Sequence, residues 1–281
     1  MPPTSSSFTP LNISTDDVPE WMGSFSISAA PNTDLWRKPP SRDTSTAPIL
    51  YTALRNPFIA AEVTVSADWE LEWDQGGLVI FAGAPPGQII PAPPALDVPS
   101  VVTLSLDDDS TTTSPSISEL SSTISTPAQT PSPDPVAQSQ RQLDRPPPYI
   151  QPAPAAKWVK VGLEFCNNAC HATSVVANSD GADWSLSALP AHHARRLDLR
   201  VKIERIGYAL WVWYEDEVLG WKKLREVTWF FWGVEDKAVR VGVYASRPAN
   251  FGISIYDRRH GGGQSVGARN LCVDFEGLEI F

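Results

Sequence analysis

The chain lacks any apolar run long enough to cross a membrane, because no stretch approaches the ~18 consecutive apolar residues of a spanning helix. Its amino-terminal sequence, MPPTSSSFTP, has neither the basic segment nor the apolar core of a secretory signal peptide. Its three cysteines, Cys166, Cys170 and Cys272, are an odd number. We therefore expect a cytoplasmic protein with free thiols and no membrane partner.

The sequence also lacks an excess of basic charge. It has 22 Lys and Arg residues against 32 Asp and Glu residues, a formal net charge of −10. About half of this excess falls in residues 86–156, which hold seven acidic and two basic side chains. An acidic protein gains nothing from a phosphate backbone, so nucleic acid is not expected as a partner.

Proline and tryptophan are distributed unevenly. Sixteen of the 27 prolines lie between Pro85 and Pro154, and none of the 11 tryptophans does. This composition cannot bury enough apolar area to offset the entropy of ordering. We predict a disordered insertion over residues 85–155, a partly disordered arm over residues 1–24, and a single domain formed by residues 25–84 and 156–281.

No convincing amphipathic helix is present, and period-two alternation is frequent instead. In residues 158–165, Val159, Val161 and Leu163 point to one face, while Lys160 and Glu164 point to the other. Similar alternation predicts strands over residues 58–67, 69–81, 197–204 and 238–247, and residues 37–48 are predicted to form a loop. Strands at this spacing indicate an all-β sandwich.

Two of these strands carry the same polar pattern, a cation followed two residues later by a glycine: Lys160 and Gly162, and Arg240 and Gly242. A glycine on an exposed sheet face weakens the strand, which makes sense where a sugar ring or a covering loop lies flat against it. The alternative is a solvated, salt-bridged face. The candidate ligand-binding residues are Asp74, Gln75, Trp158, Lys160, Glu164, Asp183, Trp184, Arg240 and Tyr244.

A glycoside hydrolase is the alternative function. Glu70 and Glu72 alternate on the predicted strand and would lie ~7 Å apart on one face. Retaining glycosidases need two carboxyl groups at about this separation. The spacing resembles the E-x-D-x-E signature of family-16-type glucanases, but the middle Asp and the final Glu are missing.

Neither a metal nor a cofactor is expected. Cys166, Cys170 and His171 have no second half of a zinc site, so the cysteines are interpreted as buried or loop thiols. His192 and His193, beside two arginines, are interpreted as a solvated loop. The glycine-rich GGGQSVG has no following Lys-Ser/Thr and therefore does not predict a phosphate loop.

The insertion offers a third hypothesis, an interaction scaffold. Ser-Pro and Thr-Pro pairs at residues 126–133 could be phosphorylated, and RPPPY at 145–149 resembles a WW-type ligand. Short motifs of this kind also arise by chance in such compositions.

Five motifs together resemble a known family: DQGGLVIF (74–81), WVKVGLEF (158–165), SVVANSDGADWSL (174–186), RIGYALWVWY (205–214) and VRVGVYASRP (239–248). They resemble the fungal regulation-of-enolase-like domain of unknown function, in the concanavalin A-like lectin/glucanase superfamily. The resemblance implies a concanavalin A-like jelly-roll β-sandwich acting as a non-catalytic binding or regulatory module. Its partner would be a carbohydrate or a metabolic enzyme, and the oligomeric state stays open.

Overall fold

The computed structural model describes residues 7–88, 156–193, 196–249 and 269–281. The chain divides into a first unit, Met1–Ile90 with Pro154–Phe281, and a second, Pro91–Ala153, whose residues lie outside the described ranges. All the strands described below belong to the first unit. The predicted disorder of the insertion concerns residues that lie almost entirely outside the described part of the chain.

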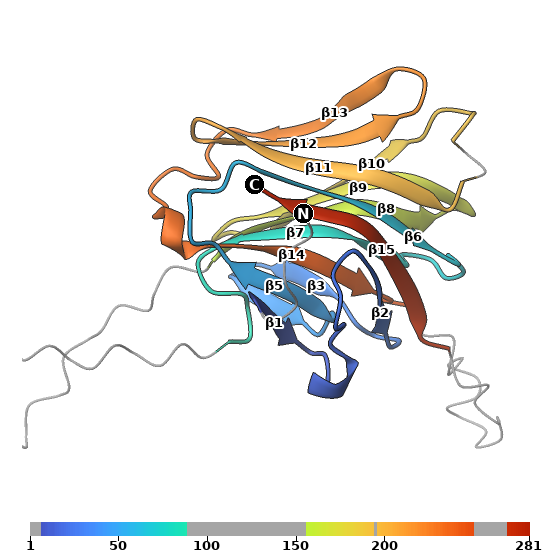
Figure 1. Ribbon diagram of the computed structural model, residues 1–281, viewed down its shortest axis with the longest axis horizontal. Coiled ribbons are helices and arrows are strands. Elements are labelled where there is room, and N and C mark those ends of the chain that lie inside the picture. Colours follow the sequence, from blue (N-terminus) through green and yellow to red (C-terminus); the bar gives the residue numbers. More distant parts are fainter. Residues whose placement is uncertain (1–6, 89–155, 194–195, 250–268) are drawn as a thin grey trace, which may run out of the picture. The chain divides into compact units, whose positions relative to one another are not determined.

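Two antiparallel sheets lie in two layers (Figure 1). The seven-stranded sheet has the order β1 (Phe8–Leu11), β5 (Ile49–Ala53), β14 (Val239–Ser246), β7 (Gln75–Ala82), β8 (Lys157–Cys166), β9 (Ala169–Ala177) and β10 (Ala182–Ala188). The six-stranded sheet has the order β13 (Gly220–Val227), β12 (Ala209–Asp216), β11 (Asp198–Ile206), β6 (Ala60–Ala67), β15 (Leu271–Ile280) and β2 (Ser24–Ala29). The predicted all-β jelly-roll sandwich is confirmed.

The helical elements that lie wholly within the described ranges are two 3₁₀ turns, η2 (Thr15–Asp17) and η3 (Asp236–Ala238). Accordingly, none of the described helices is long and apolar enough to cross a membrane. The predicted absence of amphipathic helices is therefore confirmed for these ranges.

The main core fills the space between the sheets and follows the period-two pattern. Val159, Val161 and Leu163 of β8 belong to the same buried cluster as Val201 of β11 and Phe275 of β15. The connection from β8 to β9 is short because Asn167 and Asn168 both adopt the left-handed conformation, with φ of 53° and 59°. Asparagine tolerates this conformation, which suits a two-residue hairpin.

A second apolar cluster covers the outer face of the seven-stranded sheet, the face turned away from the six-stranded sheet. It joins Val79, Phe81 and Trp158 to Leu35 of the β3–β4 hairpin. This hairpin consists of β3 (Leu35–Lys38) and β4 (Arg42–Ser45), so the predicted loop at 37–48 is wrong. Both faces of the central strands are consequently buried.

The sheet glycines are explained by backbone packing rather than by a bound ligand. A Cβ atom on Gly162 would collide with the backbone oxygen of Gly76 on β7, and one on Gly242 would collide with that of Leu50 on β5. At each glycine, the backbone of the neighbouring strand, β7 or β5, lies too close to leave room for a side chain. The close backbone approach therefore explains both glycines without a sugar ring or a covering loop lying flat on the sheet.

The carboxylate-rich segment before β7 is a turn, not the predicted strand. The strand begins at Gln75, and Trp73 has a φ of 69°. The Asp74 carboxylate accepts hydrogen bonds from the amides of Glu70 (3.2 Å) and Leu71 (2.9 Å). An aspartate side chain that accepts from nearby amides stabilises a turn in place of a strand.

Candidate functional site

The outer face of the seven-stranded sheet carries a hollow of about 450 Å³, here called the tryptophan groove. Its size is in the ~300–1,000 Å³ range of small-molecule sites. Strands β3, β7, β8, β9 and β10 and the loops beside them contribute its lining. The lining residues are Asp34, Trp36, Lys38, Trp73, Gln75, Lys160, Glu164, Val175, Trp184 and Pro248.

Two partly exposed indoles form walls of the groove. Trp73 is 48% exposed and belongs to the turn before β7, whereas Trp184 is 42% exposed and lies on β10. The Trp184 Nε1 atom donates a hydrogen bond to the Glu164 carboxylate at 3.1 Å, which fixes the ring orientation. The Trp184 ring is thus held in place, and both indoles present aromatic surface to solvent.

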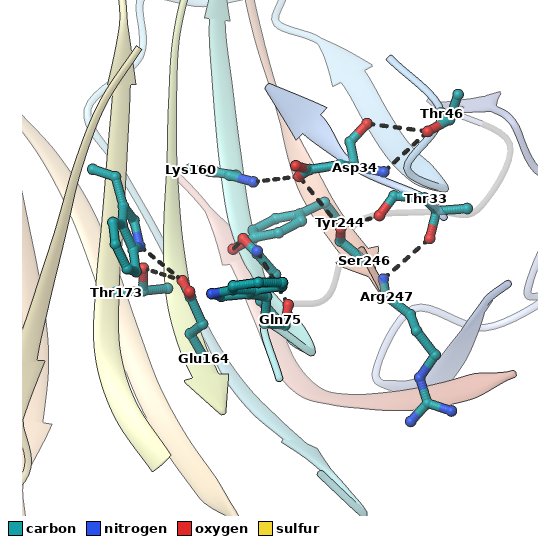
Figure 2. A network of polar contacts seen from close by, with 12 residues as sticks. Thr33, Asp34, Thr46, Gln75, Lys160, Glu164, Thr173, Tyr244, Ser246 and Arg247 are labelled. Carbon is teal, nitrogen blue, oxygen red and sulfur yellow. Dashed lines mark hydrogen bonds and ion pairs between the residues drawn. The ribbon is translucent and has the colours of Figure 1, made fainter. Parts of the chain in front are cut away.

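A buried cation lies in the floor of the groove. Lys160 is 1% exposed, and its Nζ atom is 3.0 Å from Oδ1 of Asp34 and 5.4 Å from the ring centroid of Tyr244. Figure 2 shows Lys160 reaching from β8 toward the Asp34 loop. The carboxylate and the aromatic face together compensate the ammonium group for its lost hydration.

A buried carboxylate lies four residues further along β8, on the same face of the strand as Lys160. Glu164 is 1% exposed and accepts hydrogen bonds from Thr173 Oγ1 (2.7 Å) and Trp184 Nε1. Burial raises the pKa of Glu164, and the two hydrogen bonds and the charge of Lys160 oppose this effect without cancelling it. Lys160 and Glu164 are therefore buried groups rather than parts of a solvated sheet face.

The raised pKa of Glu164 predicts a pH dependence of stability. The unfolded state ionises Glu164 near pH 4.5, whereas the folded state retains the proton to a higher pH. The contribution of Glu164 to the free energy of unfolding is therefore fully present below pH 4.5 and is lost as the pH rises through the folded pKa.

Urea unfolding measures this loss when the free energies of unfolding of the wild type and of Glu164→Gln are compared from pH 4.5 upward. We expect the wild type to lose stability relative to Glu164→Gln as the pH rises. A relative gain of stability by the wild type over the same range would contradict the raised pKa.

A hydrogen-bonded network fixes the Asp34 loop to β14 (Figure 2). Ser246 Oγ donates to the Thr33 carbonyl at 2.7 Å, and the Arg247 amide donates to Thr33 Oγ1 at 3.1 Å. The Asp34 amide in turn donates to Thr46 Oγ1 at 3.0 Å. Asp34 is thus held beside Lys160 by hydrogen bonds between side chains and backbone, two of which connect segments that are 213 or 214 residues apart in the sequence.

The structure brings five of the nine predicted ligand-binding residues to the groove. Gln75, Lys160, Glu164 and Trp184 line it, and Tyr244 lies beneath Lys160 with no exposed surface. Burial raises the pKa of Tyr244 well above its ordinary value, so its hydroxyl stays neutral. These five residues meet because β7, β8 and β14 are adjacent strands and β10 is separated from β8 only by β9.

The other four predicted residues lie elsewhere. Trp158 is fully buried in the second apolar cluster, and Asp74 is fully buried in an ion pair with Arg247. The Asp183 side chain is 81% exposed and lines a different hollow, which is bordered by β10 and β13. Arg240 donates to the carbonyl of Lys237 at 2.6 Å and does not line the groove. None of the four is placed to contact a ligand in the groove.

The proposed hydrolase pair also lies outside the groove lining. Glu72 accepts hydrogen bonds from the Asn167 amide (3.1 Å) and from Cys166 Sγ (3.0 Å). The Glu70 side chain is 54% exposed, with a carboxylate oxygen 3.7 Å from the Arg247 guanidinium. The predicted arrangement of two carboxylates on one strand face is wrong, because the segment is a turn.

The predicted interpretation of two cysteines as buried thiols is confirmed. Cys166 and Cys170 are buried and free. The hydrogen bond to Glu72 and burial raise the pKa of Cys166 to about 11, and burial raises that of Cys170 to about 11. Neither thiol is activated as a nucleophile or ligand.

Six of the ten residues that line the groove were not predicted from the sequence. Trp36 and Lys38 come from the β3–β4 hairpin, most of which was predicted to be loop, and Asp34 directly precedes it. Trp73 lies in a turn that was predicted to be part of the strand over residues 69–81. No local pattern in the sequence indicates which strands Trp36 packs against. Only the long-range docking of the hairpin reveals this wall.

The sequence matches the family described as "Protein of unknown function (DUF1349)" over residues 16–126 and 150–258. The chain belongs to this family. The DUF1349 match includes every residue that lines the tryptophan groove.

Three relatives illustrate the range of similarity to this DUF1349 chain. "Uncharacterized protein AN7484" of Emericella nidulans is 29% identical over 231 residues, which are 81% of this chain and 79% of that protein. A functionally unknown protein from Saccharomyces cerevisiae has a TM-score of 0.55 and 14% identity, covering 99% of this chain and 98% of that chain, and it shares the fold. The GH43 BlXynB protein from Bacillus licheniformis is more distant, with a TM-score of 0.45 and 10% identity over 93% of this chain and 33% of that chain.

Proposed function

We propose that the tryptophan groove binds a neutral saccharide and that the protein acts as a non-catalytic binding module. The observation that carries this proposal is the pair of partly exposed indoles, Trp73 and Trp184, beside a floor of buried polar groups. The C–H face of a sugar ring complements the negative face of an indole, and its hydroxyl groups can bond to fixed polar atoms.

The charge of the groove supports a neutral ligand. Lys160 and Lys38 contribute cations, whereas Asp34 and Glu164 contribute carboxylates. Lys160 and Asp34 already neutralise each other at 3.0 Å. A strongly charged ligand would meet repulsion from one sign or the other, but hydroxyl groups can donate to the carboxylates and accept from the ammonium groups.

Calorimetric titration of the full chain with a panel of neutral gluco- and xylo-oligosaccharides tests the proposal. We expect Trp73→Ala and Trp184→Ala each to weaken binding by about 10-fold or more, equivalent to ~1.4 kcal/mol. Trp232→Ala is the matched control, because Trp232 is 66% exposed and does not line the groove.

Trp184→Phe separates stacking from orientation, since it keeps an aromatic face but loses the hydrogen bond to Glu164. We expect a smaller loss of affinity than for Trp184→Ala. No binding by the wild type, or equal binding by the wild type and both alanine variants, would contradict the saccharide site.

A metabolic-enzyme partner, as in regulation-of-enolase proteins, is the alternative occupant that we propose for the same surface. Pull-down with the alanine variants of Trp73 and Trp184 distinguishes a protein that uses the groove from one that binds elsewhere.

The cytoplasmic location and the absence of a nucleic-acid partner remain predictions, as does a scaffold role for the insertion.

A further inference from the structure

We propose a second site, for a divalent transition-metal ion such as Zn²⁺, formed by His192, His193 and Asp216. One donor atom from each of these side chains lies within 4.8 Å of the other two. Donors bound to one zinc ion at ~2.0–2.2 Å lie roughly 3.4 Å apart, so small side-chain rotations would close the site. The two imidazoles come from the loop before β11, and the carboxylate ends β12.

Asp216 is rigidly placed and retains an unused oxygen. Its Oδ1 atom accepts hydrogen bonds from the amides of Val218 (2.8 Å) and Leu219 (3.0 Å) in the β12–β13 turn. Its Oδ2 atom is buried and has no hydrogen-bond partner among the described residues. A buried carboxylate oxygen without a partner is costly, and a cation would compensate it.

His193 provides the second unpartnered atom. The residue is 3% exposed, in contrast to the predicted solvated loop, and its Nδ1 atom is buried with no partner in the described structure. Its Nε2 atom lies 3.4 Å from the Glu217 amide, at the limit of a hydrogen bond. Binding of an ion at Nδ1 would place the ring proton on Nε2, and it would replace the long hydrogen bond that Nε2 accepts from the Glu217 amide. His193 also lines a hollow of about 270 Å³ that can hold water.

His192 supplies the third proposed ligand and lies at the protein surface. Its Nε2 atom is 3.2 Å from Asp216 Oδ1, and its side chain is 42% exposed. Water can therefore reach the fourth position of an ion that three protein ligands hold. Two imidazoles and one carboxylate favour zinc and similar first-row ions, whereas Mg²⁺ and Ca²⁺ prefer oxygen ligands alone.

The test uses the full chain without a histidine tag, dialysed against EDTA and then titrated with Zn²⁺ alone. We expect one equivalent to bind to the wild type and to raise its melting temperature. His192→Ala should weaken binding by at least ~100-fold, because even partners that only orient metal ligands contribute ~10–100-fold. His192 is the preferred site for substitution, since its side chain is exposed enough to be removed without opening a cavity.

His171→Ala is the matched control, because His171 lies on β9 with Nδ1 3.0 Å from the Ala169 carbonyl and is not part of the cluster. This variant should bind as the wild type does. Asp216→Asn is the second test variant, and it should also lose binding. A wild type without bound zinc, or His192→Ala and Asp216→Asn with unchanged affinity, would overturn the proposal. A Co²⁺ spectrum with thiolate charge-transfer bands would also overturn it.

Discussion

Replacement of Gly162 by alanine is expected to destabilise the protein by ~3 kcal/mol or more. The added Cβ atom would collide with the Gly76 backbone oxygen and would lie against the Gly77 Cα atom. These are backbone atoms in a sheet that is buried on both faces, so a rotamer change cannot relieve the collision. The strands β7 and β8 would have to separate, which weakens their ladder and the packing on both sides.

Urea denaturation of the wild type and Gly162→Ala measures this loss through the midpoint and slope of the transition. Gly181→Ala is the matched control, because its added Cβ atom would lie 3.5 Å from Pro39, an ordinary van der Waals distance. We expect the control to change stability by about 0.5 kcal/mol or less. If Gly162→Ala lost as little stability as Gly181→Ala, the close approach of β7 and β8 would not explain why residue 162 is glycine.

Removal of the Asp74 carboxylate is expected to cost ~3–5 kcal/mol, because the buried Arg247 guanidinium loses its hydrogen-bonded counter-ion and keeps, among the described residues, only the more exposed Glu70 carboxylate at 3.7 Å. Arg247 Nε and Nη2 lie 2.8 and 2.7 Å from the two carboxylate oxygens of Asp74, and both residues are almost fully buried. The same carboxylate caps the turn that carries Trp73. Asp74→Ala should therefore lower both stability and the order of one groove wall.

A double-mutant cycle separates the ion pair from other effects of these substitutions. We expect the free-energy loss of Asp74→Ala with Arg247→Ala to be smaller than the sum of the single losses by ~1–3 kcal/mol. The same cycle on the ion pair of Glu235 and Lys237 is the control. Their side chains are 73% and 84% exposed, so this pair should contribute about 0.5 kcal/mol or less to the free energy of unfolding. Additive losses at Asp74 and Arg247 would show that the pair is not coupled.

The fold class was predictable because strand alternation is a local property. Val159, Val161 and Leu163 face the main core, and Lys160 and Glu164 face the opposite way, as the sequence pattern predicts. The turn at residues 68–74 was not predictable from alternation, because Trp69, Leu71 and Trp73 show the same period as a strand. There, hydrogen bonds from backbone amides to Asp74 override the pattern.

The candidate site was predicted only in part, for a physical reason. The sequence by itself determined an all-β sandwich and the polar side of β8, since both follow from the period-two geometry of neighbouring residues. The tertiary structure decided what covers that side: Asp34 meets Lys160 across 126 residues of sequence, and the β3–β4 hairpin buries Trp158. Contacts across such separations depend on how hairpins dock against a sheet, which is set by packing of the whole domain and not by any local pattern.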